Sequence, residues 1–541
     1  MSAQTNGSQS KGHDVPLDAV IVGAGFGGMY MLHRLRGLGF KARVFEAGSG
    51  VGGTWYWNRY PGARCDVESV QYSYQFDETL QQEWDWSERY AAQPELLRYA
   101  NHVADRFDLR RDMQFDTRVL AATFDEADGS WTIETSDGAR TRARFCIMAT
   151  GCLSSVNMPK FEGIERFRGD RYHTGHWPHE GVDFTGKRVA VIGTGSSAVQ
   201  SIPIIAEQAK HLYIFQRTAS YAIPAHNAPL DPEFVRQVKE NYPAMRARAK
   251  QTMTGIDFDY SDRKALETPP SGRADEYEKR WQRGGLSFLG AFQDLMVSRE
   301  ANDTAADFVC SKIREKVSDP IVAELLSPKN TIGCKRLCID IGYYETFNRE
   351  NVELIDVSEA PIEAITENGV RVGGKEYEVD AIVFATGFDA MTGALLKIDI
   401  RGRKGLPLRQ KWSEGPRTYL GVAMAGFPNL FTITGPGSPS VLTNMLPTIE
   451  QHVDWIAGVI EHMRAKELAV IEPEAGAEEA WVGHVGDLAG NTLRYTCSSW
   501  YLGVNIPGKP RVFMPYIGGF PKYVEHCNKI AANGYEGFAL R

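Results

Sequence analysis

A glycine-rich turn near the start of the chain has the residue types and spacing that bind the phosphates of a dinucleotide. It contains Gly23, Gly25 and Gly28 and stands between the apolar run 19–22 and a helix-like stretch over 29–36. In such a turn the first glycine permits a tight bend, the second lets the main chain approach a pyrophosphate, and the third lets the helix pack on the strand. The helix start then presents N–H groups and a positive dipole to the phosphates. The sequence therefore predicts a strand, a nucleotide-binding turn and a helix in that order.

An acidic residue after the second predicted strand indicates which nucleotide this turn takes. Glu46 follows the run 41–45 and stands about 20 positions beyond Gly23, where a carboxylate can accept hydrogen bonds from ribose hydroxyls. The first site is therefore expected to hold a dinucleotide whose ribose carries no 2′-phosphate.

The same pattern recurs in the middle of the chain with a different residue after its second strand. Gly193 and Gly195 follow the predicted strand 188–192, and Gln216 stands where the first motif has Glu46. The next residue, Arg217, can bind a 2′-phosphate bidentately, whereas a carboxylate would repel it. The second site is predicted to take NADPH rather than NADH; a solvated surface arginine is the alternative for Arg217. The residues expected to contact this nucleotide are Gly193, Gly195, Ser196, Ser197, Arg217 and Thr218.

Two dinucleotide folds in one chain indicate a tightly held FAD and a nicotinamide nucleotide that exchanges with solution. Two apolar runs support this interpretation, because each ends in an Ala-Thr-Gly turn, at 149–151 and at 385–387, that suits a chain crossing between nucleotide domains. We expect an α/β fold with two Rossmann-like dinucleotide-binding domains.

The expected domains are interleaved along the chain. After a disordered tail over 1–16, the FAD domain takes residues 17–151 and 388–541, and the NADPH domain takes 152–387 between them. Within the NADPH domain, 227–329 is rich in charge and in helical periodicity and is predicted to be a helical insertion. The segment 267–276, with two prolines and a glycine, is predicted to be a loop inside it.

Composition excludes several other classes of protein. The 541 residues include 60 Lys and Arg against 68 Asp and Glu, and the resulting net charge of −8 argues against nucleic-acid binding through bulk charge. No apolar run reaches the roughly 18 residues of a membrane span. Eight cysteines, none in a Cys-x-x-Cys motif, disfavour a disulfide scaffold, a structural zinc and a dithiol redox pair. The polar N-terminus has no secretory signal, so a cytoplasmic, metal-free protein is expected, monomeric or weakly oligomeric.

Ahead of the second glycine motif, the sequence contains a longer and more selective pattern. It consists of Phe167, Gly169, His173, Trp177 and Pro178. This segment resembles the fingerprint of the type I Baeyer–Villiger monooxygenases. A second segment is similar to another signature of that family and includes Gly53, Trp55, Tyr60, Pro61, Gly62 and Asp66. The resemblance runs from about residue 17 to the C-terminus and is strongest to the phenylacetone and steroid enzymes.

The resemblance implies an activity and a set of cofactors. Enzymes of this family hold FAD, use NADPH and O₂, and insert one oxygen atom beside a ketone carbonyl to give an ester or a lactone through a flavin peroxide, with sulfoxidation as a side activity. The implied substrates here are small, aryl, cyclic or bulky steroidal ketones.

By resemblance, two charged residues form the catalytic centre. Arg336 is implied to lie over the flavin and to stabilise the peroxide, since its guanidinium stays charged at any working pH. Asp66 is implied to pair with it; a cap on a helix beginning near Val67 is the alternative role. Lys335 is implied to contact the 2′-phosphate together with Arg217. A solvated loop is the alternative for the Lys335–Arg336 pair.

The resemblance also assigns residues around the two cofactors. Trp55 is implied to contact a cofactor, and Trp500 to contact the nicotinamide, with a plain core tryptophan as the alternative for Trp500. His173 is expected to have a structural or dynamic role in the link between domains rather than a direct acid–base role. The loop 435–446 resembles the substrate loop of the family and contributes Ser440, Val441, Leu442 and Met445.

Two other functions remain open at this point. A flavin monooxygenase restricted to amines or sulfides shares both glycine motifs, and Arg336, Pro178 and the first-domain signature distinguish the Baeyer–Villiger type from it. A non-catalytic protein that kept both nucleotide folds would be expected to lose Arg336 and Asp66, and both are present.

Overall fold

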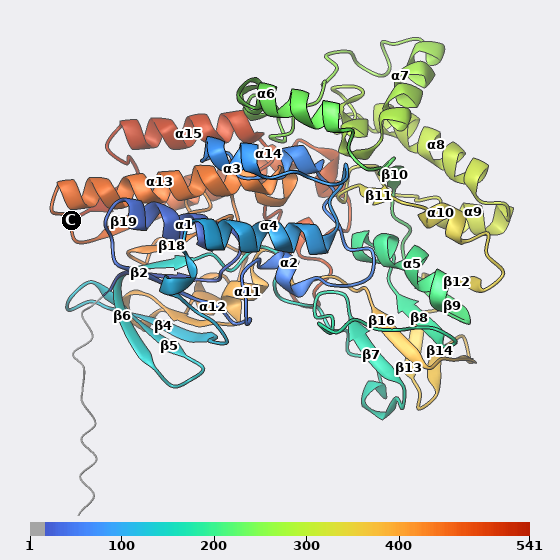
Figure 1. Cartoon of the computed structure of the whole chain (residues 1–541), viewed down its shortest axis with the longest axis horizontal. Helices are drawn as coiled ribbons and strands as arrows, with labels where there is room; N and C mark the ends of the chain where they lie inside the picture. Colours follow the sequence, from blue (N-terminus) through green and yellow to red (C-terminus); the bar gives the residue numbers. More distant parts are fainter. Residues whose placement is uncertain (1–16) are drawn as a thin grey trace, which may run out of the picture.

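The protein, described by a computed structural model over residues 17–541, contains two open sheets that stand side by side (Figure 1). The tail expected at 1–16 lies outside the described residues. The first sheet has the strand order β17-β4-β5-β6-β1-β2-β3, and β18 pairs with β6. Its strands are β1 (Leu17–Val22), β2 (Ala42–Phe45), β3 (Met113–Gln114), β4 (Val119–Asp125), β5 (Ser130–Thr135), β6 (Arg140–Met148), β17 (Asp399–Arg401) and β18 (Leu430–Thr432).

Strands from both ends of the described chain meet in this first sheet. β1 lies between β2 and β6 and is parallel to both, while β18, from the C-terminal part of the chain, is parallel to β6. β1 carries an apolar run because both of its faces are covered, as is usual for a parallel strand. The carboxyl end of β1 is therefore fixed in the middle of the sheet, where a ligand site of an α/β fold is expected.

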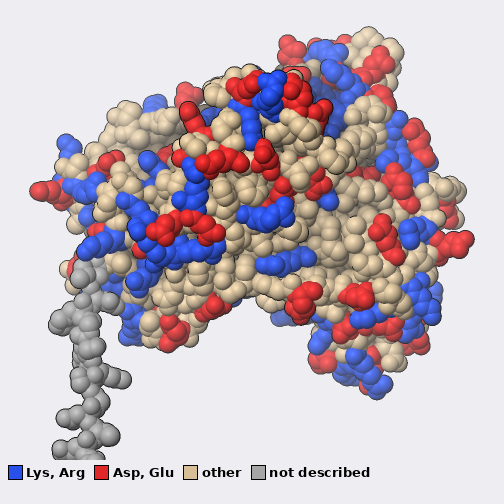
Figure 2. All heavy atoms as spheres, in the orientation of Figure 1, with Lys and Arg blue, Asp and Glu red and all other residues tan. Residues whose placement is uncertain are grey.

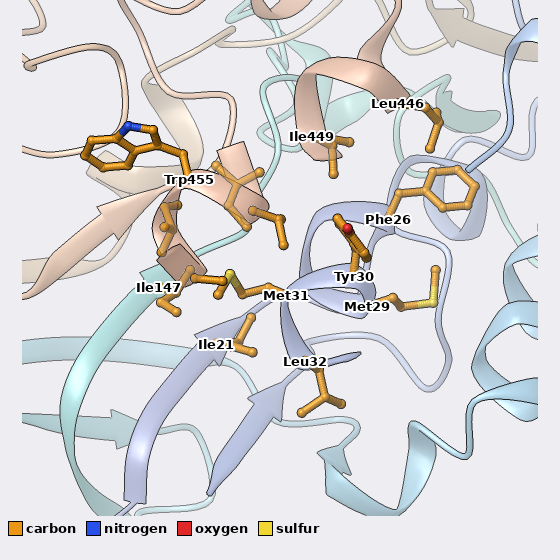
Figure 3. Close-up of a cluster of buried hydrophobic side chains, with 14 of the residues drawn as sticks. Ile21, Phe26, Met29, Tyr30, Met31, Leu32, Ile147, Leu446, Ile449 and Trp455 are labelled. Atoms are coloured by element: carbon orange, nitrogen blue, oxygen red, sulfur yellow. The ribbon is translucent and has the colours of Figure 1, made fainter. Parts of the chain in front are cut away.

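Two helices from opposite ends of the chain cover the first sheet. α1 (Phe26–Gly37) packs against α13 (Met445–Ala465), and their shared core is shown in Figure 3. There Met31 of α1 lies between Ile21 of β1 and Ile147 of β6, with Trp455 of α13 nearby. Burying a side chain of this size contributes about 1.5–3 kcal/mol to stability. This packing fixes the glycine turn between β1 and α1.

The second sheet is parallel throughout, with the order β12-β9-β8-β16-β7. The helix α5 (Ser196–Gln208) follows β8 and packs on it through buried apolar residues. The strands are β7 (Asp170–His173), β8 (Arg188–Ile192), β9 (His211–Gln216), β12 (Val352–Asp356) and β16 (Ala381–Phe384). A three-stranded antiparallel sheet lies beside it: β13 (Ile362–Ile365), β14 (Gly369–Val372) and β15 (Lys375–Glu378).

Between β9 and β12 the chain leaves the second sheet and forms a group of helices. They are α6 (Pro232–Lys250), α7 (Pro270–Arg283), α8 (Arg299–Lys316) and α9 (Pro320–Leu326). The strands before and after these helices, β10 (Ala222–Pro224) and β11 (Cys338–Asp340), pair in parallel. One expectation is wrong here: the segment 267–276 is not all loop, because α7 begins at Pro270. Proline has no N–H to lose in the first helical turn, so the two prolines start a helix instead of interrupting one.

The remaining elements connect and cover these parts. They are α2 (Thr54–Trp57), α3 (Glu78–Glu83), α4 (Gln93–Arg106), α10 (Tyr343–Thr346), α11 (Gly393–Leu396), α12 (Leu408–Lys411), α14 (Ala475–Gly490), α15 (Phe520–Ala532), β19 (Ile471–Pro473) and β20 (Phe538–Leu540). Acidic and basic side chains are interspersed over the face shown in Figure 2. Among the residues described, no helix combines the length and the apolar character that crossing a membrane requires.

Candidate active site

The two glycine turns have the same construction in the two sheets. Gly23 and Gly193 both have positive φ, of 105° and 109°. A Cβ on Gly23 would lie 2.6 Å from the carbonyl oxygen of Ala149, and one on Gly193 would lie 2.6 Å from that of Ala385. The two Ala-Thr-Gly turns therefore pack directly behind the two glycine turns, where only glycine leaves room for them.

Each turn leads into the N-terminus of a long helix. Gly25 is the N-cap of α1 and Gly195 is the N-cap of α5, both in extended conformation and without a side-chain cap. Gly28 is buried in the first turn of α1 against the oxygen of Gly23. The first N–H groups of both helices thus point out of the turns without side-chain partners, which is the arrangement that binds phosphate.

Glu46 lies at the end of β2, beside the first turn. Its carboxylate accepts hydrogen bonds from the main-chain N–H of Ala24 (2.7 Å) and of Gly48 (2.8 Å). The side chain is buried, and burial raises its pKa while these main-chain donors lower it. The acid is thus held against the glycine turn, as its predicted contact with a ribose requires.

The predicted NADPH residues gather around the second turn. Arg217 and Thr218 are exposed after β9, and the Thr218 carbonyl accepts a hydrogen bond from Thr194 in the turn (2.9 Å). Burial lowers the pKa of Lys335, and the neighbouring charge of Arg217 lowers it further. Two cations that repel one another at the mouth of a glycine turn form a suitable site for a dianionic 2′-phosphate.

Ser196 and Ser197 stand at the start of α5. The hydroxyl of Ser196 contacts Cys338, and the hydroxyl of Ser197 contacts Thr174.

Arg336 and Asp66 form a bidentate ion pair that joins the loop before β11 to the segment 53–66. Arg336 Nε donates to Asp66 Oδ2, and Arg336 Nη2 donates to Oδ1 at 2.9 Å. Burial alone would lower the pKa of Arg336, but the carboxylate of Asp66 outweighs it and raises that pKa, so the guanidinium stays charged. The alternative role of Asp66 as a helix cap is wrong, because the next helical turn begins at Ser69 and is preceded by Glu68.

The substrate loop meets Arg336 through its main chain. Arg336 Nη1 donates to the carbonyl oxygen of Val441 at 2.7 Å. Ser440, with φ of 42°, contacts the buried thiol of Cys152 at 2.9 Å. Leu442 and Met445 are half-buried and pack on an apolar cluster that also includes Cys152, Met391, Val441, Tyr501, Leu502, Phe513 and Met514.

The segment 53–66 connects the first nucleotide turn to the second sheet. Trp55 is buried and donates from Nε1 to the hydroxyl of Tyr72 (3.2 Å). Tyr60 donates to the side-chain oxygen of Gln200 on α5 (2.8 Å), and Gln200 donates back to the carbonyl of Arg64 (3.2 Å). This segment therefore places Asp66 relative to the second nucleotide turn, and Gln200 is a residue that sequence reasoning did not single out.

The fingerprint residues lie in the link that leads into the second sheet. His173 ends β7; its Nδ1 accepts from the N–H of Gly175 (3.0 Å), and its Nε2 contacts the hydroxyl of Thr386 (3.3 Å). Burial lowers the pKa of His173 to about 4. Phe167 and Trp177 are buried, and a Cβ on Gly169 would strike the carbonyl of Asp380. Pro178 follows Trp177 and is half-buried. His173 thus joins the fingerprint to the second Ala-Thr-Gly turn.

Trp500 lies half-buried on the C-terminal segment, with its ring 4.2 Å from that of Tyr501. Tyr501 is buried close enough to the charges of Arg336 and Asp66 for both to act on its pKa, which burial raises. Sequence reasoning missed Tyr501, because one tyrosine among 22 carries no local signal.

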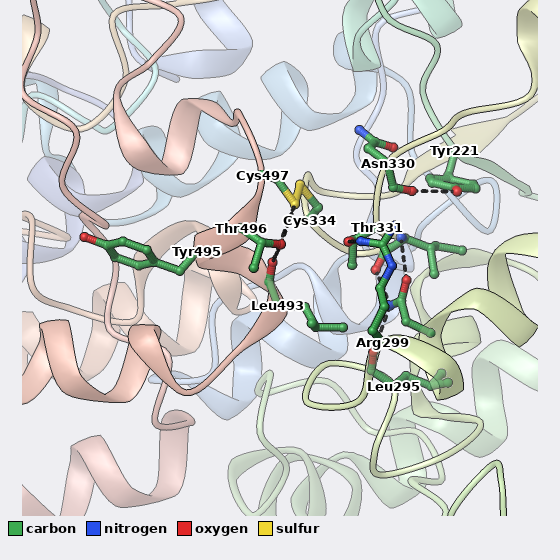
Figure 4. The surroundings of a disulfide bond; sticks show 12 residues. Tyr221, Leu295, Arg299, Asn330, Thr331, Cys334, Leu493, Tyr495, Thr496 and Cys497 are labelled. Atoms are coloured by element: carbon green, nitrogen blue, oxygen red, sulfur yellow. Dashed lines mark hydrogen bonds between the residues drawn. A yellow bond between two sulfur atoms is a disulfide. The ribbon is translucent and has the colours of Figure 1, made fainter.

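One pair of cysteines is bonded although the sequence contains no Cys-x-x-Cys motif. Cys334 and Cys497 are joined by a disulfide bond, 163 residues apart in sequence (Figure 4). A Cys-x-x-Cys search finds only neighbours in sequence, and this pair is brought together by the fold. The other six cysteines are unpaired.

Comparison with known proteins decides the family. Residues 20–265 match the pyridine nucleotide-disulphide oxidoreductase family. The chain is 44% identical to a Baeyer–Villiger monooxygenase of Pseudooceanicola batsensis over 99% of its own length and 98% of that protein. The structure of an oxidised steroid monooxygenase bound to NADP superposes with a TM-score of 0.93 at 52% identity, over 97% of this chain and 99% of that one. A closed structure of cyclohexanone monooxygenase superposes with a TM-score of 0.95 at 40% identity, with coverage of 97% and 99%.

The chain belongs to the Baeyer–Villiger monooxygenase family. The predictions of an α/β fold with Rossmann-like nucleotide sites and of an enzyme that uses FAD and NADPH are confirmed. As a Baeyer–Villiger monooxygenase it oxidises ketones, and the alternative of oxygenation restricted to heteroatoms is not supported. The higher identity to a steroid enzyme than to a cyclohexanone enzyme agrees with the resemblance drawn from the sequence.

The described residues fit both cofactors of a Baeyer–Villiger monooxygenase. The first turn has helix N–H groups for a pyrophosphate and an acid beside it, and the second has helix N–H groups with two cations in place of the acid. The carboxylate of Glu46 would face any 2′-phosphate at the first turn with like charge. The two sites therefore differ in the sign of charge that their second strand presents.

Proposed function

We propose that Arg336, held by Asp66, presents a fixed positive charge to the flavin of bound FAD and to the ketone that reacts there. The observation that carries this proposal is the bidentate pair between Arg336 and Asp66, whose guanidinium also donates to the main chain of the substrate loop at Val441. When bound, FAD supplies an activated oxygen atom from O₂ after reduction by NADPH. A charge held in place before the reaction stabilises developing negative charge without reorganising at the moment of reaction.

We further propose a division of the nucleotide-binding residues. Gly23, Gly25 and Gly28 with Glu46 and Trp55 bind FAD, within a domain formed by 17–151 and 388–541. The NADPH domain is then 152–387, with the helical insertion 227–329. Its nucleotide is bound by Gly193, Gly195, Ser196, Ser197, Arg217, Thr218 and Lys335, and Trp500 contacts the nicotinamide. His173 and its fingerprint neighbours support the link between the domains.

The substrate proposed is a small-molecule ketone with an aryl or bulky group. Leu442 and Met445 are half-buried and offer apolar surface in the loop whose Val441 carbonyl contacts Arg336, and Ser440 in the same loop is fully buried. Such a lining removes water from the carbonyl and makes no charged contact that would select a polar ketone. Sulfides that enter the same site would be oxidised as a side activity. The protein is proposed to act as a monomer or weak oligomer in the cytoplasm, without nucleic acid or membrane as a partner.

The test is product analysis with a panel of ketones. The FAD-loaded enzyme is given NADPH, air and one ketone at a time, namely phenylacetone, cyclohexanone, cyclopentadecanone or progesterone, and the products are identified by mass spectrometry. An ester from phenylacetone or progesterone, formed faster than the lactone from cyclohexanone, is the expected result. Oxidation of a sulfide such as thioanisole with no ester from any of the four ketones would refute the proposal.

A further inference from the structure

The disulfide joins the two segments that carry the residues assigned above to the nicotinamide nucleotide and the flavin. Cys334 directly precedes Lys335 and Arg336, and Cys497 stands three positions before Trp500 (Figure 4). The two Cα atoms are 6.1 Å apart, within the range of about 4.4–6.8 Å that a disulfide spans. The cross-link therefore fastens the C-terminal segment 493–502 to the loop that ends in Arg336.

The segment 493–502 makes different hydrogen bonds to the C-terminal part of the chain and to the helical insertion. Toward the C-terminal part of the chain, Met514 donates to the carbonyl of Tyr501 (2.9 Å), and Arg511 donates to the carbonyls of Tyr495 (2.9 Å) and Cys497 (3.2 Å). Toward the helical insertion, the N–H of Leu493 donates to the carbonyl of Met296 (2.9 Å). The disulfide adds a covalent bond on the side of the insertion.

Both cysteines stand close in sequence to the residues proposed to contact the cofactors. One residue separates Cys334 from Arg336, and two separate Cys497 from Trp500. A bond at this place therefore restricts Trp500 and Tyr501 against Arg336. Without it, the part of the segment around Cys497 is held toward the insertion by the hydrogen bond from Leu493, while Tyr501 and Leu502 remain anchored by burial. A covalent cross-link acts by removing the open conformations from the ensemble.

We propose that Cys334 and Cys497 form a thiol–disulfide exchange site, whose oxidised form fastens segment 493–502 over Arg336 and whose reduced form lets that segment open. The existence of the site rests on the cysteine pair alone. Its effect on nicotinamide release rests on the proposed function, since that function places Trp500 and Lys335 at the nucleotide.

The reductant belongs to the class of dithiols. A thiolate of the dithiol attacks Sγ of Cys497, which is 8% exposed, in preference to that of Cys334, which is fully buried. The bond between the two protein sulfurs breaks, and Cys334 leaves as a thiolate that takes up a proton. The second thiol of the reductant, as its thiolate, then attacks the mixed disulfide, closes a disulfide within the reductant and releases Cys497 as a thiolate that also takes up a proton. Two electrons and two protons pass to the protein, and a disulfide oxidant reverses the exchange.

Peptide mapping tests whether the pair exchanges. FAD-loaded enzyme, purified in air, is digested under non-reducing conditions after its remaining thiols have been blocked. The expected result is one cross-linked peptide that contains Cys334 and Cys497, which disappears after treatment of the folded enzyme with dithiothreitol and returns after treatment with oxidised glutathione. Detection of both cysteines as blocked thiols in the air-purified enzyme would overturn the proposal.

Limited proteolysis tests whether the cross-link fastens the segment. Trypsin cleavage after Arg494 should become at least about tenfold faster when wild type is reduced, because the open conformations return. The Cys497→Ser variant should be cleaved at the fast rate with or without dithiothreitol. The Cys310→Ser variant, which removes an unpaired half-buried thiol on α8, should behave as wild type.

The same samples separate this inference from the proposed function. Release of bound NADP⁺, measured as the nucleotide that has left the enzyme at successive times after rapid dilution into nucleotide-free buffer, should be faster in reduced wild type and in Cys497→Ser than in oxidised wild type. Equal cleavage rates in oxidised and reduced wild type would refute the fastening role even if ester formation is normal. Absence of ester formation with a normal cleavage response would refute the proposed function and leave the exchange site standing.

Discussion

Arg336 joins the carboxylate of Asp66 to the main chain of the substrate loop at Val441. Its Nε and Nη2 face Asp66, and its Nη1 donates to the carbonyl oxygen of Val441 at 2.7 Å. Asp66 comes from the segment after the first nucleotide turn and Val441 from the loop before α13, so one guanidinium fixes three distant parts of the chain. Because arginine has more N–H groups than these contacts use, it can still donate to a ligand.

The first prediction concerns Arg336 itself. Arg336→Ala should still have its flavin reduced by NADPH, since the proposed hydride transfer does not need the guanidinium, but ester formation should fall by about 10²–10³-fold because a positioned donor is lost. Flavin reduction is followed by its absorbance in a stopped-flow instrument without oxygen, and the ester by gas chromatography. Arg336→Lys is the matched control. It keeps a positive charge but lacks the planar guanidinium that binds in a bidentate way, so it should recover part of the rate. Ester formation at the wild-type rate in Arg336→Ala would exclude the proposed role.

The second prediction separates positioning from catalysis at Asp66. Asp66→Asn keeps the shape of the side chain but removes the charge that holds Arg336, so ester formation should fall by about 10- to 100-fold while the KM for NADPH changes little. Asp66→Glu, which keeps the charge, should recover more activity than Asp66→Asn. If both variants lost flavin binding as well, measured by the flavin content of the purified protein, the effect would be structural rather than positional.

The sequence predicted the local parts of the site much better than the contacts between them. Gly23, Gly193 and Arg217 could be placed because each belongs to a short motif in which a glycine or a charge has a defined physical task. The start of α7 at Pro270 was missed because proline signals both loops and helix starts. The Val441 carbonyl and the Cys334–Cys497 bond have no local pattern, since a main-chain oxygen is present at every residue and the two cysteines meet only after the sheets have packed.

The third prediction tests the nucleotide preference. Arg217→Ala should raise the KM for NADPH by about tenfold, the effect of one exposed charge-assisted hydrogen bond, and should leave the KM for NADH nearly unchanged. Initial rates of nucleotide oxidation with a saturating ketone give both values. Arg349→Ala removes an exposed arginine on a loop before β12 and serves as the control for net charge. A wild-type enzyme with a lower KM for NADH than for NADPH would contradict the assignment of this site.

The fourth prediction concerns the protonation of His173. Burial lowers its pKa to about 4, and its Nδ1 accepts a hydrogen bond from Gly175, so the ring is neutral at pH 6–9. Because His173 is proposed to support the link between the domains, His173→Gln should slow flavin reduction. Because the ring is neutral in this range, the shape of the pH profile between pH 6 and 9 should stay the same. The rate is measured in the absence of oxygen across that range. Loss of an ionisation from the profile of the variant would indicate direct acid–base catalysis instead.

The fifth prediction uses a buried acid outside the proposed site. Glu450 on α13 accepts hydrogen bonds from the N–H groups of Gln75 (2.6 Å) and Phe76 (3.1 Å). Burial, with a smaller contribution from the charge of Asp454, raises the pKa of Glu450 to about 7, against the lowering effect of the Gln75 N–H, Lys250 and Arg246. Between the unfolded pKa of 4.5 and about 7, the folded protein binds more protons at this group than the unfolded chain does. Stability from this group is therefore fully present below pH 4.5 and is lost as the pH rises toward 7, by about 3 kcal/mol.

Glu450→Gln removes this dependence while keeping an acceptor for the two N–H groups. We expect the variant to unfold at the same temperature as wild type at pH 5 and at a higher temperature at pH 8, as measured by thermal unfolding of the FAD-loaded enzyme. Glu461→Gln, further along α13 and exposed in its contact with Arg464, is the control and should show no such divergence. A wild type that is the more stable of the two at pH 8 would mean that the carboxylate of Glu450 is charged and well paired in the folded protein.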